Sequence, residues 1–160
     1  MPQTASQAES IQGALVGAFY SRVAVSDGFD FYFDNFVLSS REIISGDEAM
    51  INSKFVEGYA PARSTANPEC IAKSAVVAAC LGAEVSAVEV LPDSSLLLKF
   101  NNKVEIRLPT DTPIVDWHWA ITEAGGDPYL GCLVGCFAPG DIQGSMPNNS
   151  FKPKPLRGSA

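Results

Sequence analysis

The chain has 160 residues, 46% of them hydrophobic, and a formal net charge of −7; this length and composition are typical of one globular domain. The negative charge argues against nucleic acids and anionic membranes as partners, because both would repel it. No apolar run is long enough to span a membrane, and the first residues lack the basic and apolar regions of a secretory signal. We therefore expect a cytoplasmic protein whose acidic surface suits a basic protein partner.

Residues 1–12 are polar and show no hydrophobic periodicity, so we expect them to form a mobile N-terminal arm. A single α+β domain is expected over residues 13–147. Residues 148–160 contain three of the eleven basic residues, no acidic residue and two prolines. This composition predicts a disordered basic tail.

Two stretches, 16–38 and 81–108, alternate apolar and polar residues, which predicts strands with one buried face. Five residues of the first stretch recur in the second at a shift of 65, and three more recur at a shift of 67. We interpret this as two repeated antiparallel β-meanders forming one sheet; the alternative is a chance similarity between two β-rich segments. The repeated asparagines, Asn35 and Asn102, follow a strand in each copy. We expect them to form structural turns in the left-handed conformation, which asparagine tolerates.

The segment between the repeats is expected to contain one more strand, a crossing loop and the main helix. Residues 39–66 lack a regular pattern and supply the strand and the loop. Asn67, Pro68 and Glu69 then form a helix start, with a side-chain cap, a proline in the first turn and an acidic residue near the positive end of the helix dipole. The helix is expected to run to residue 81, to stop at Gly82, and to pack on the sheet.

Candidate binding residues lie on one strand and in the segment that follows the second repeat. Three phenylalanines at 29, 31 and 33 point to one face of their strand, so the residues between them point to the other. The second group surrounds the only histidine. Separately, residues 129–137 are expected to form a final apolar strand. The predicted partner-binding residues are Asp30, Tyr32, Asp34, Asp111, Asp116 and His118.

The sequence contains few signals for catalysis or metal binding. A histidine close to carboxylates could perform acid–base chemistry, but no motif marks a serine or cysteine nucleophile near His118. Cys132 and Cys136 have the wrong spacing for a zinc knuckle and no neighbouring histidine. We expect no metal and no cofactor.

With these motifs in view, the chain resembles an uncharacterised bacterial family that is known only as a domain of unknown function. The resemblance covers residues 17–37, 67–82, 83–108 and 116–120, and it rests on turns and caps. It departs from the family at Asn102, where the family favours glycine. Domains of this size and acidity loosely resemble immunity proteins, which neutralise bacterial toxins.

From these features we expect a non-enzymatic protein-binding domain, whose most specific version is an immunity protein that neutralises a toxin by occlusion. Acidic side chains would then pair with a basic surface of the toxin. The alternative is a small-molecule sensor that uses an aromatic pocket between sheet and helix. A weaker alternative is a hydrolase centred on His118.

Overall fold

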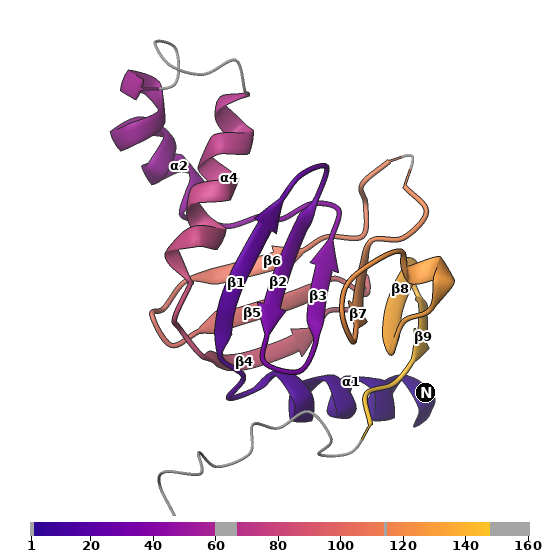
Figure 1. Cartoon of the computed structure of the whole chain (residues 1–160). Helices are drawn as coiled ribbons and strands as arrows, with labels where there is room; N and C mark the ends of the chain where they lie inside the picture. Colours follow the sequence, from indigo (N-terminus) through magenta and orange to yellow (C-terminus); the bar gives the residue numbers. More distant parts are fainter. Residues whose placement is uncertain (1, 60–66, 114, 148–160) are drawn as a thin grey trace, which may run out of the picture.

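The computed structural model describes residues 2–59, 67–113 and 115–147, whose nine strands form two antiparallel sheets (Figure 1). One sheet has six strands in the order β1-β2-β3-β7-β8-β9, and the other has three in the order β4-β5-β6. This confirms the α+β class, with two sheets in place of the expected single one. The strands are β1 (Tyr20–Val25), β2 (Phe29–Phe33), β3 (Val37–Ser40), β4 (Val85–Val90), β5 (Leu96–Phe100), β6 (Glu105–Leu108), β7 (Trp119–Thr122), β8 (Val134–Ala138) and β9 (Asp141–Gly144).

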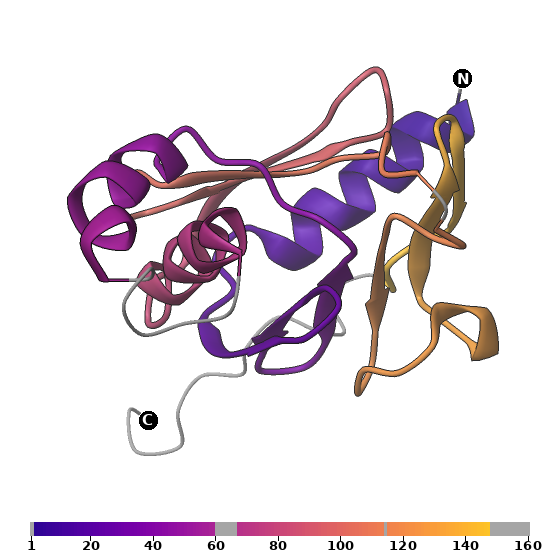
Figure 2. The ribbon, with the colours of Figure 1, turned by 90° about the horizontal axis from the view of Figure 1, so that it is seen from above.

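The hydrophobic core lies between the two sheets, which appear as separate layers when seen from above (Figure 2). Side chains from both sheets are fully buried in it, including Phe31 and Trp119 from the larger sheet and Leu98 and Ile106 from the smaller one. The three phenylalanines of β2 are all buried, whereas Asp30 and Tyr32 between them are half-exposed. The alternation of the sequence therefore assigned the two faces of this strand correctly.

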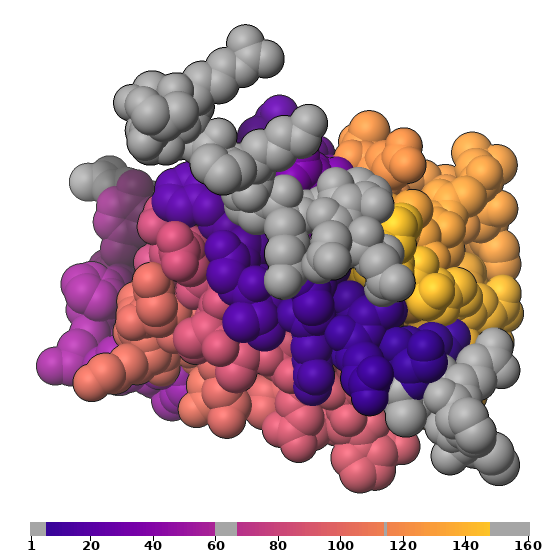
Figure 3. Space-filling view, turned by 90° about the horizontal axis from the view of Figure 1, so that it is seen from below, coloured from indigo at the N-terminus to yellow at the C-terminus, as the bar shows by residue number. Residues whose placement is uncertain are grey.

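The prediction of a mobile arm over residues 1–12 is wrong for the part that the structure describes, because residues 2–12 belong to helix α1 (Pro2–Leu15). Ile11 and Leu15 are fully buried in the core. Gln7 donates from Nε2 to the carbonyls of Ile142 (2.8 Å) and Gly144 (2.9 Å) on β9. Seen from below, α1 (indigo) lies between the rose atoms of the second meander and the yellow atoms of β9 (Figure 3). The helix is thus held by contacts with distant segments. The predicted disordered tail, 148–160, lies outside the described residues.

Helix α4 (Pro68–Ala79) lies where the sequence predicted a helix, but α1 is of similar length, so α4 is not a single main helix. The side chain of Asn67 accepts a hydrogen bond from the backbone N–H of Glu69 (2.8 Å), as an N-cap does. The chain leaves the helix through Gly82, whose φ of 85° is readily adopted only by glycine. Local chemistry alone was sufficient to locate this helix.

Two segments differ from the sequence prediction. The strand expected within residues 39–66 is absent from the described part beyond β3. Helix α2 (Glu48–Ile51) and a π-helical segment, η1 (Asn52–Val56), occupy that part of the chain. The final strand expected over 129–137 begins later, at Val134, and pairs with β9 in a hairpin. A short 3₁₀ helix, η2 (Pro128–Leu130), precedes it.

The meanders β1-β2-β3 and β4-β5-β6 share a β-bulge and a serine hydrogen bond at equivalent positions. The register of β1 against β2 skips Ser21, and the register of β4 against β5 skips Ser86, so both strands contain a bulge. The hydroxyl of Ser21 donates to the carbonyl of Tyr32 (3.1 Å), and that of Ser86 donates to the carbonyl of Lys99 (3.0 Å). The positions of these bonds follow the shifts of 65 and 67 in the sequence.

The starts of the two meanders exchange backbone hydrogen bonds with one another. Residues 17–20 and 82–85 each donate twice and accept twice, which gives the joint a local two-fold pattern. Phe19 and Glu84 form an isolated antiparallel bridge at its centre. The four bonds run from the N–H of Gly17 to the carbonyl of Val85 (2.8 Å), Tyr20 to Ala83 (3.0 Å), Gly82 to Tyr20 (2.8 Å) and Val85 to Ala18 (3.1 Å).

The left-handed conformation expected for Asn35 and Asn102 is wrong, although both residues lie in turns. Neither has a positive φ; in the second turn it is Lys103 that has one, at 71°. Asn102 accepts from the N–H of Val104 (3.1 Å) and donates to the carbonyl of Ala79 (3.2 Å). Its side chain therefore closes the turn and ties it to α4.

This turn yields a paired prediction. We expect Lys103→Gly to be neutral or to raise the free energy of unfolding by up to about 1 kcal/mol, because glycine relieves the left-handed strain. We expect Asn102→Gly to lower it by about 1 kcal/mol, because two side-chain hydrogen bonds are lost. Urea unfolding of the two variants checks both, and the opposite order of midpoints would contradict the turn geometry.

Candidate functional site

The structure distributes the predicted binding residues over several surfaces. Asp30 and Tyr32 lie on the outer face of β2, and the guanidinium of Arg22 stacks 4.7 Å from the centre of the Tyr32 ring. Asp34 is exposed in the turn after β2. No hydrogen bond or ion pair within the described ranges joins any two of the six residues. The prediction therefore identified no single cluster.

The other three predicted residues lie before β7. Asp111 and Asp116 are exposed, whereas His118 is 7% exposed. The backbone of His118 is bound on both sides, since its N–H donates to Cys136 (2.8 Å) and its carbonyl accepts from the N–H of Arg41 (3.0 Å). His118 therefore contributes its backbone to the joint between strands and keeps its side chain inside.

The environment of His118 does not favour hydrolysis. Burial lowers its pKa below the usual 6.5, and the nearby Asp111 opposes this only in part, so the imidazole is neutral at pH 7. Its Nδ1 is buried without a hydrogen-bond partner. Among the residues that the structure describes, no hydroxyl or thiol forms a hydrogen bond with the imidazole, so no nucleophile is prepared there.

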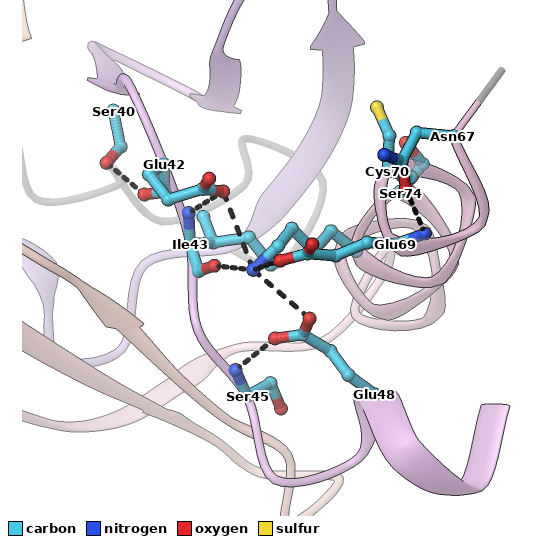
Figure 4. A network of polar contacts seen from close by, with 10 residues as sticks. Ser40, Glu42, Ile43, Ser45, Glu48, Asn67, Glu69, Cys70 and Ser74 are labelled. Atoms are coloured by element: carbon cyan, nitrogen blue, oxygen red, sulfur yellow. Dashed lines mark hydrogen bonds and ion pairs between the residues drawn. The ribbon is translucent and has the colours of Figure 1, made fainter. Parts of the chain in front are cut away.

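A cluster that the sequence prediction missed surrounds Lys73 of α4 (Figure 4). The side chain of this lysine is only 7% exposed, and its ammonium group donates to the carbonyl of Ile43. Three carboxylates also approach the nitrogen: Glu48 at 3.1 Å, and Glu42 and Glu69 at 3.6 Å each. A buried ammonium group is costly unless it is paired, and here each of the flanking segments supplies a partner.

The same carboxylates fold the loop between β3 and α2. Glu42 accepts from the N–H of Ile43 (2.9 Å), and Glu48 accepts from the N–H of Ser45 (2.8 Å). Ile44 in the same loop forms a backbone bridge with Arg107 of β6. Lys73 thus joins α4 to a loop that is itself attached to the smaller sheet.

Arg41 lines two small cavities next to this cluster. A cavity of about 250 Å³ lies between the β1–β2 turn, Glu42 and the start of α4. Another, of about 220 Å³, is lined by Asp30, Ser39 and Trp117. The guanidinium of Arg41 stacks 4.2 Å from the centre of the Trp117 ring and lies 3.6 Å from Asp27. We call this region the acidic site; it consists of Asp27, Asp30, Arg41, Glu42, Glu48, Glu69, Lys73 and Trp117.

The acidic site carries more negative than positive charge. Its five carboxylates face two cations, which gives a formal charge of −3. The side chain of Asp27 is 85% exposed and that of Glu69 is 69% exposed. Both lie 3.6 Å from their internal partner, a distance at which an exposed pair contributes little. These two carboxylates are therefore free to accept an ammonium or guanidinium group from outside.

Other features of the described residues offer less. A cavity of about 900 Å³ lies between α1, the β4–β5 turn and β9. The aromatic side chains expected to line a ligand pocket pack on each other instead, with the Tyr20 ring centred 5.5–5.8 Å from those of Phe31, Phe33 and Phe100. Within residues 2–59, 67–113 and 115–147, no group of three or more His, Cys, Asp or Glu is arranged for a metal ion.

The buried thiols are poorly suited to react at neutral pH. Cys80 and Cys136 are fully buried, and burial raises the pKa of each to about 11. Thiolates are the reactive form, so neither cysteine is a nucleophile near pH 7.

Comparisons of the chain with protein-family models, with curated proteins and with solved structures find no significant match. The family resemblance inferred from the motifs therefore stays a prediction. None of the helices in the described ranges combines the length and apolar character needed to cross a membrane.

The buried Lys73 gives a stability prediction. We expect Lys73→Met to lower the free energy of unfolding by about 2–3 kcal/mol, because the mutation leaves three carboxylates without their cation and two of them are partly exposed. Lys99→Met is the control, since Lys99 pairs with Glu105 at 3.9 Å on the surface and should change stability by less than about 0.5 kcal/mol. Similar unfolding midpoints for both variants would contradict the stabilising role of Lys73.

His118 gives a pH prediction. Its pKa is lower in the folded protein than in the unfolded chain, so below pH 6.5 the unfolded state binds the proton more readily and stability falls. We expect His118→Gln to lose less stability than the unmodified protein between pH 7.5 and pH 5. Urea unfolding at both pH values checks this, and equal losses would show that the imidazole is accessible to protons in the fold.

Proposed function

We propose that this chain is a non-enzymatic protein-binding domain and that the acidic site receives a basic surface of the partner. The supporting observation is the unequal charge of the site, together with the exposure of Asp27 and Glu69. Electrostatic complementarity of this kind accelerates association and selects the partner by charge. The more specific proposal is the immunity protein expected from the sequence, which would block a basic substrate-binding surface of a toxin.

Rigidity supports this use of the site. Lys73 fixes Glu42 and Glu48 by direct contacts, and both carboxylates also bind backbone N–H groups. Arg41 is held between Asp27 and the Trp117 ring. Carboxylates that are already positioned lose less conformational entropy when a cation binds.

We also propose that the meanders 16–38 and 81–108 descend from one copied unit. The equivalent bulges and the reciprocal joint support this proposal. Under the shifts of 65 and 67, the position equivalent to Lys73 is Ala8 and the position equivalent to Asp30 is Leu97. At these two positions the charge of the acidic site therefore occurs in only one copy of the unit, whereas the bulges and the backbone joint occur in both.

The test is affinity capture from an extract of the native host, with the unmodified protein and the variant D27N/D30N/E69Q as baits. These substitutions remove three negative charges and leave Glu42 and Glu48 beside Lys73 unchanged. We expect a basic protein to be retained by the first bait and to elute as salt rises, and retention to fall at least tenfold with the second. The purified partner should reproduce both effects in titrations followed by tryptophan fluorescence.

A matched control uses carboxylates outside the site. The variant E84Q/E89Q/E123Q changes the net charge by the same amount at exposed positions. We expect it to retain the partner as the unmodified protein does. If both triple variants lose retention of the partner equally, overall charge explains the loss, and binding at the acidic site is contradicted.

A further inference from the structure

Three of the four sheet edges are covered by other parts of the chain. Gln7 meets the carbonyls of β9, and Gln12 of α1 donates from Nε2 to the carbonyl of Val88 on β4 (3.1 Å). The edge of β6 is covered by Ile44, which exchanges two backbone hydrogen bonds with Arg107 (2.8 and 2.9 Å). Such cover is the usual protection of edge strands, whose free backbone groups otherwise pair with other chains.

The fourth edge, β1, has no such cover. The N–H of Phe33 donates to the carbonyl of Phe36 (3.0 Å), on the side of β3. Backbone groups alternate along a strand, so Phe31 and Phe29 also point to β3. Their partners on β1, Val23 and Val25, then point away from β2. Within the described residues, no hydrogen bond reaches the backbone of either valine.

A comparison of the two helices explains why this edge is open. Under the shift of 65, the position equivalent to Gln12 is Val77 of α4, whose side chain has no donor to offer. The hydrogen bond between α4 and β1 runs the other way, from the hydroxyl of Tyr20 to the carbonyl of Val77 (2.9 Å), at the start of β1. The side chain of Val25, at the far end, is 42% exposed. Within the described residues the backbone of Val23 and Val25 is therefore unpaired, and the side chain of Val25 is exposed.

We propose that the edge of β1 binds an extended segment of the partner as an additional strand, with basic side chains that reach the acidic site. This inference rests on the proposed function and deepens it. Strand addition supplies backbone hydrogen bonds along Val23 and Val25. Beyond Val25 the chain enters the turn that contains Asp27, which lines the cavity shared with Glu42 and Glu69. Charge therefore selects a basic segment over a second copy of this chain, whose formal charge is also −7.

The experiment measures the binding of a fluorescein-labelled KVKVKVK peptide by fluorescence anisotropy. Val23→Pro and Val25→Pro remove outward N–H groups that the β1–β2 pairing does not use, so both variants should fold. The control is Val88→Pro, at the equivalent position of β4. Circular dichroism confirms the fold of each variant before titration.

We expect the unmodified protein and Val88→Pro to bind with dissociation constants within twofold of each other, and the two β1 variants to bind at least tenfold more weakly. An EVEVEVE peptide, and a KVKVKVK peptide methylated on alternate backbone nitrogens, should also bind at least tenfold more weakly. Hydrogen exchange at Val23 and Val25 should slow when KVKVKVK is added.

Four outcomes would overturn the inference. The KVKVKVK peptide does not bind the unmodified protein, binding is unaffected by the β1 variants, or the EVEVEVE peptide binds equally well. The fourth is a dimer of the unmodified protein in light scattering that Val23→Pro abolishes, which would assign the edge to a second copy. If the peptide binds equally to the β1 variants but is lost with D27N/D30N/E69Q, the strand addition fails and the proposed function stands.

Discussion

The backbone exchange between residues 17–20 and 82–85 is the constraint on which the rest of the structure depends. It joins the edge strands of two different sheets at their first residues, and from there β1 and β4 continue in separate layers. Both helices end next to it, α1 before Gly17 and α4 before Gly82, and both glycines have a φ of 85°. Because the helix ends are fixed there, each helix is directed toward the sheet of the other meander. The position of Lys73, and with it the acidic site, follows from this geometry.

The parts of the fold that the sequence predicted are those with a local cause. Asn67, Pro68 and Gly82 determine the limits of α4 through contacts within a few residues, and the alternation in β2 determines which face is buried. Helix α1 has no comparable signal, because among its described side chains the fully buried apolar ones lie in the last two turns, and Gln7 is held by residues more than 130 positions away. The split into two sheets also depends on long-range pairing. The turn at Asn102 was misassigned by one residue because an asparagine that caps a turn and one that adopts a left-handed conformation look alike in sequence.

The acidic site shows the same limit. The pair of Glu69 and Lys73 has helical spacing and was visible in principle, but a pair at this spacing usually lies on a solvated surface. Its burial comes from Glu42 and Glu48, which belong to a segment without periodicity. Asp30 was predicted correctly as a residue of the outer face, yet Arg41 and Trp117, which line a cavity with it, come from segments that meet only in the folded protein. Proximity in sequence to aspartates suggested a chemical role for His118, whereas in the fold its side chain is buried and its Nδ1 has no hydrogen-bond partner.

Gln7 and Gln12 of α1 have a consequence for how the chain is synthesised. Gln7 emerges from the ribosome early, whereas the carbonyls that it binds belong to residues 142 and 144. Until those residues have left the exit tunnel, α1 can dock on β4 through Gln12, but the two hydrogen bonds of Gln7 have no acceptor. Closure of the larger sheet is thereby coupled to the synthesis of β9, and contacts of such sequence separation form slowly. On a ribosome that stalls before residue 144, the start of α1 would lack its contacts with β9 and the larger sheet would have an unpaired edge. Chaperones and proteases recognise such exposed surfaces.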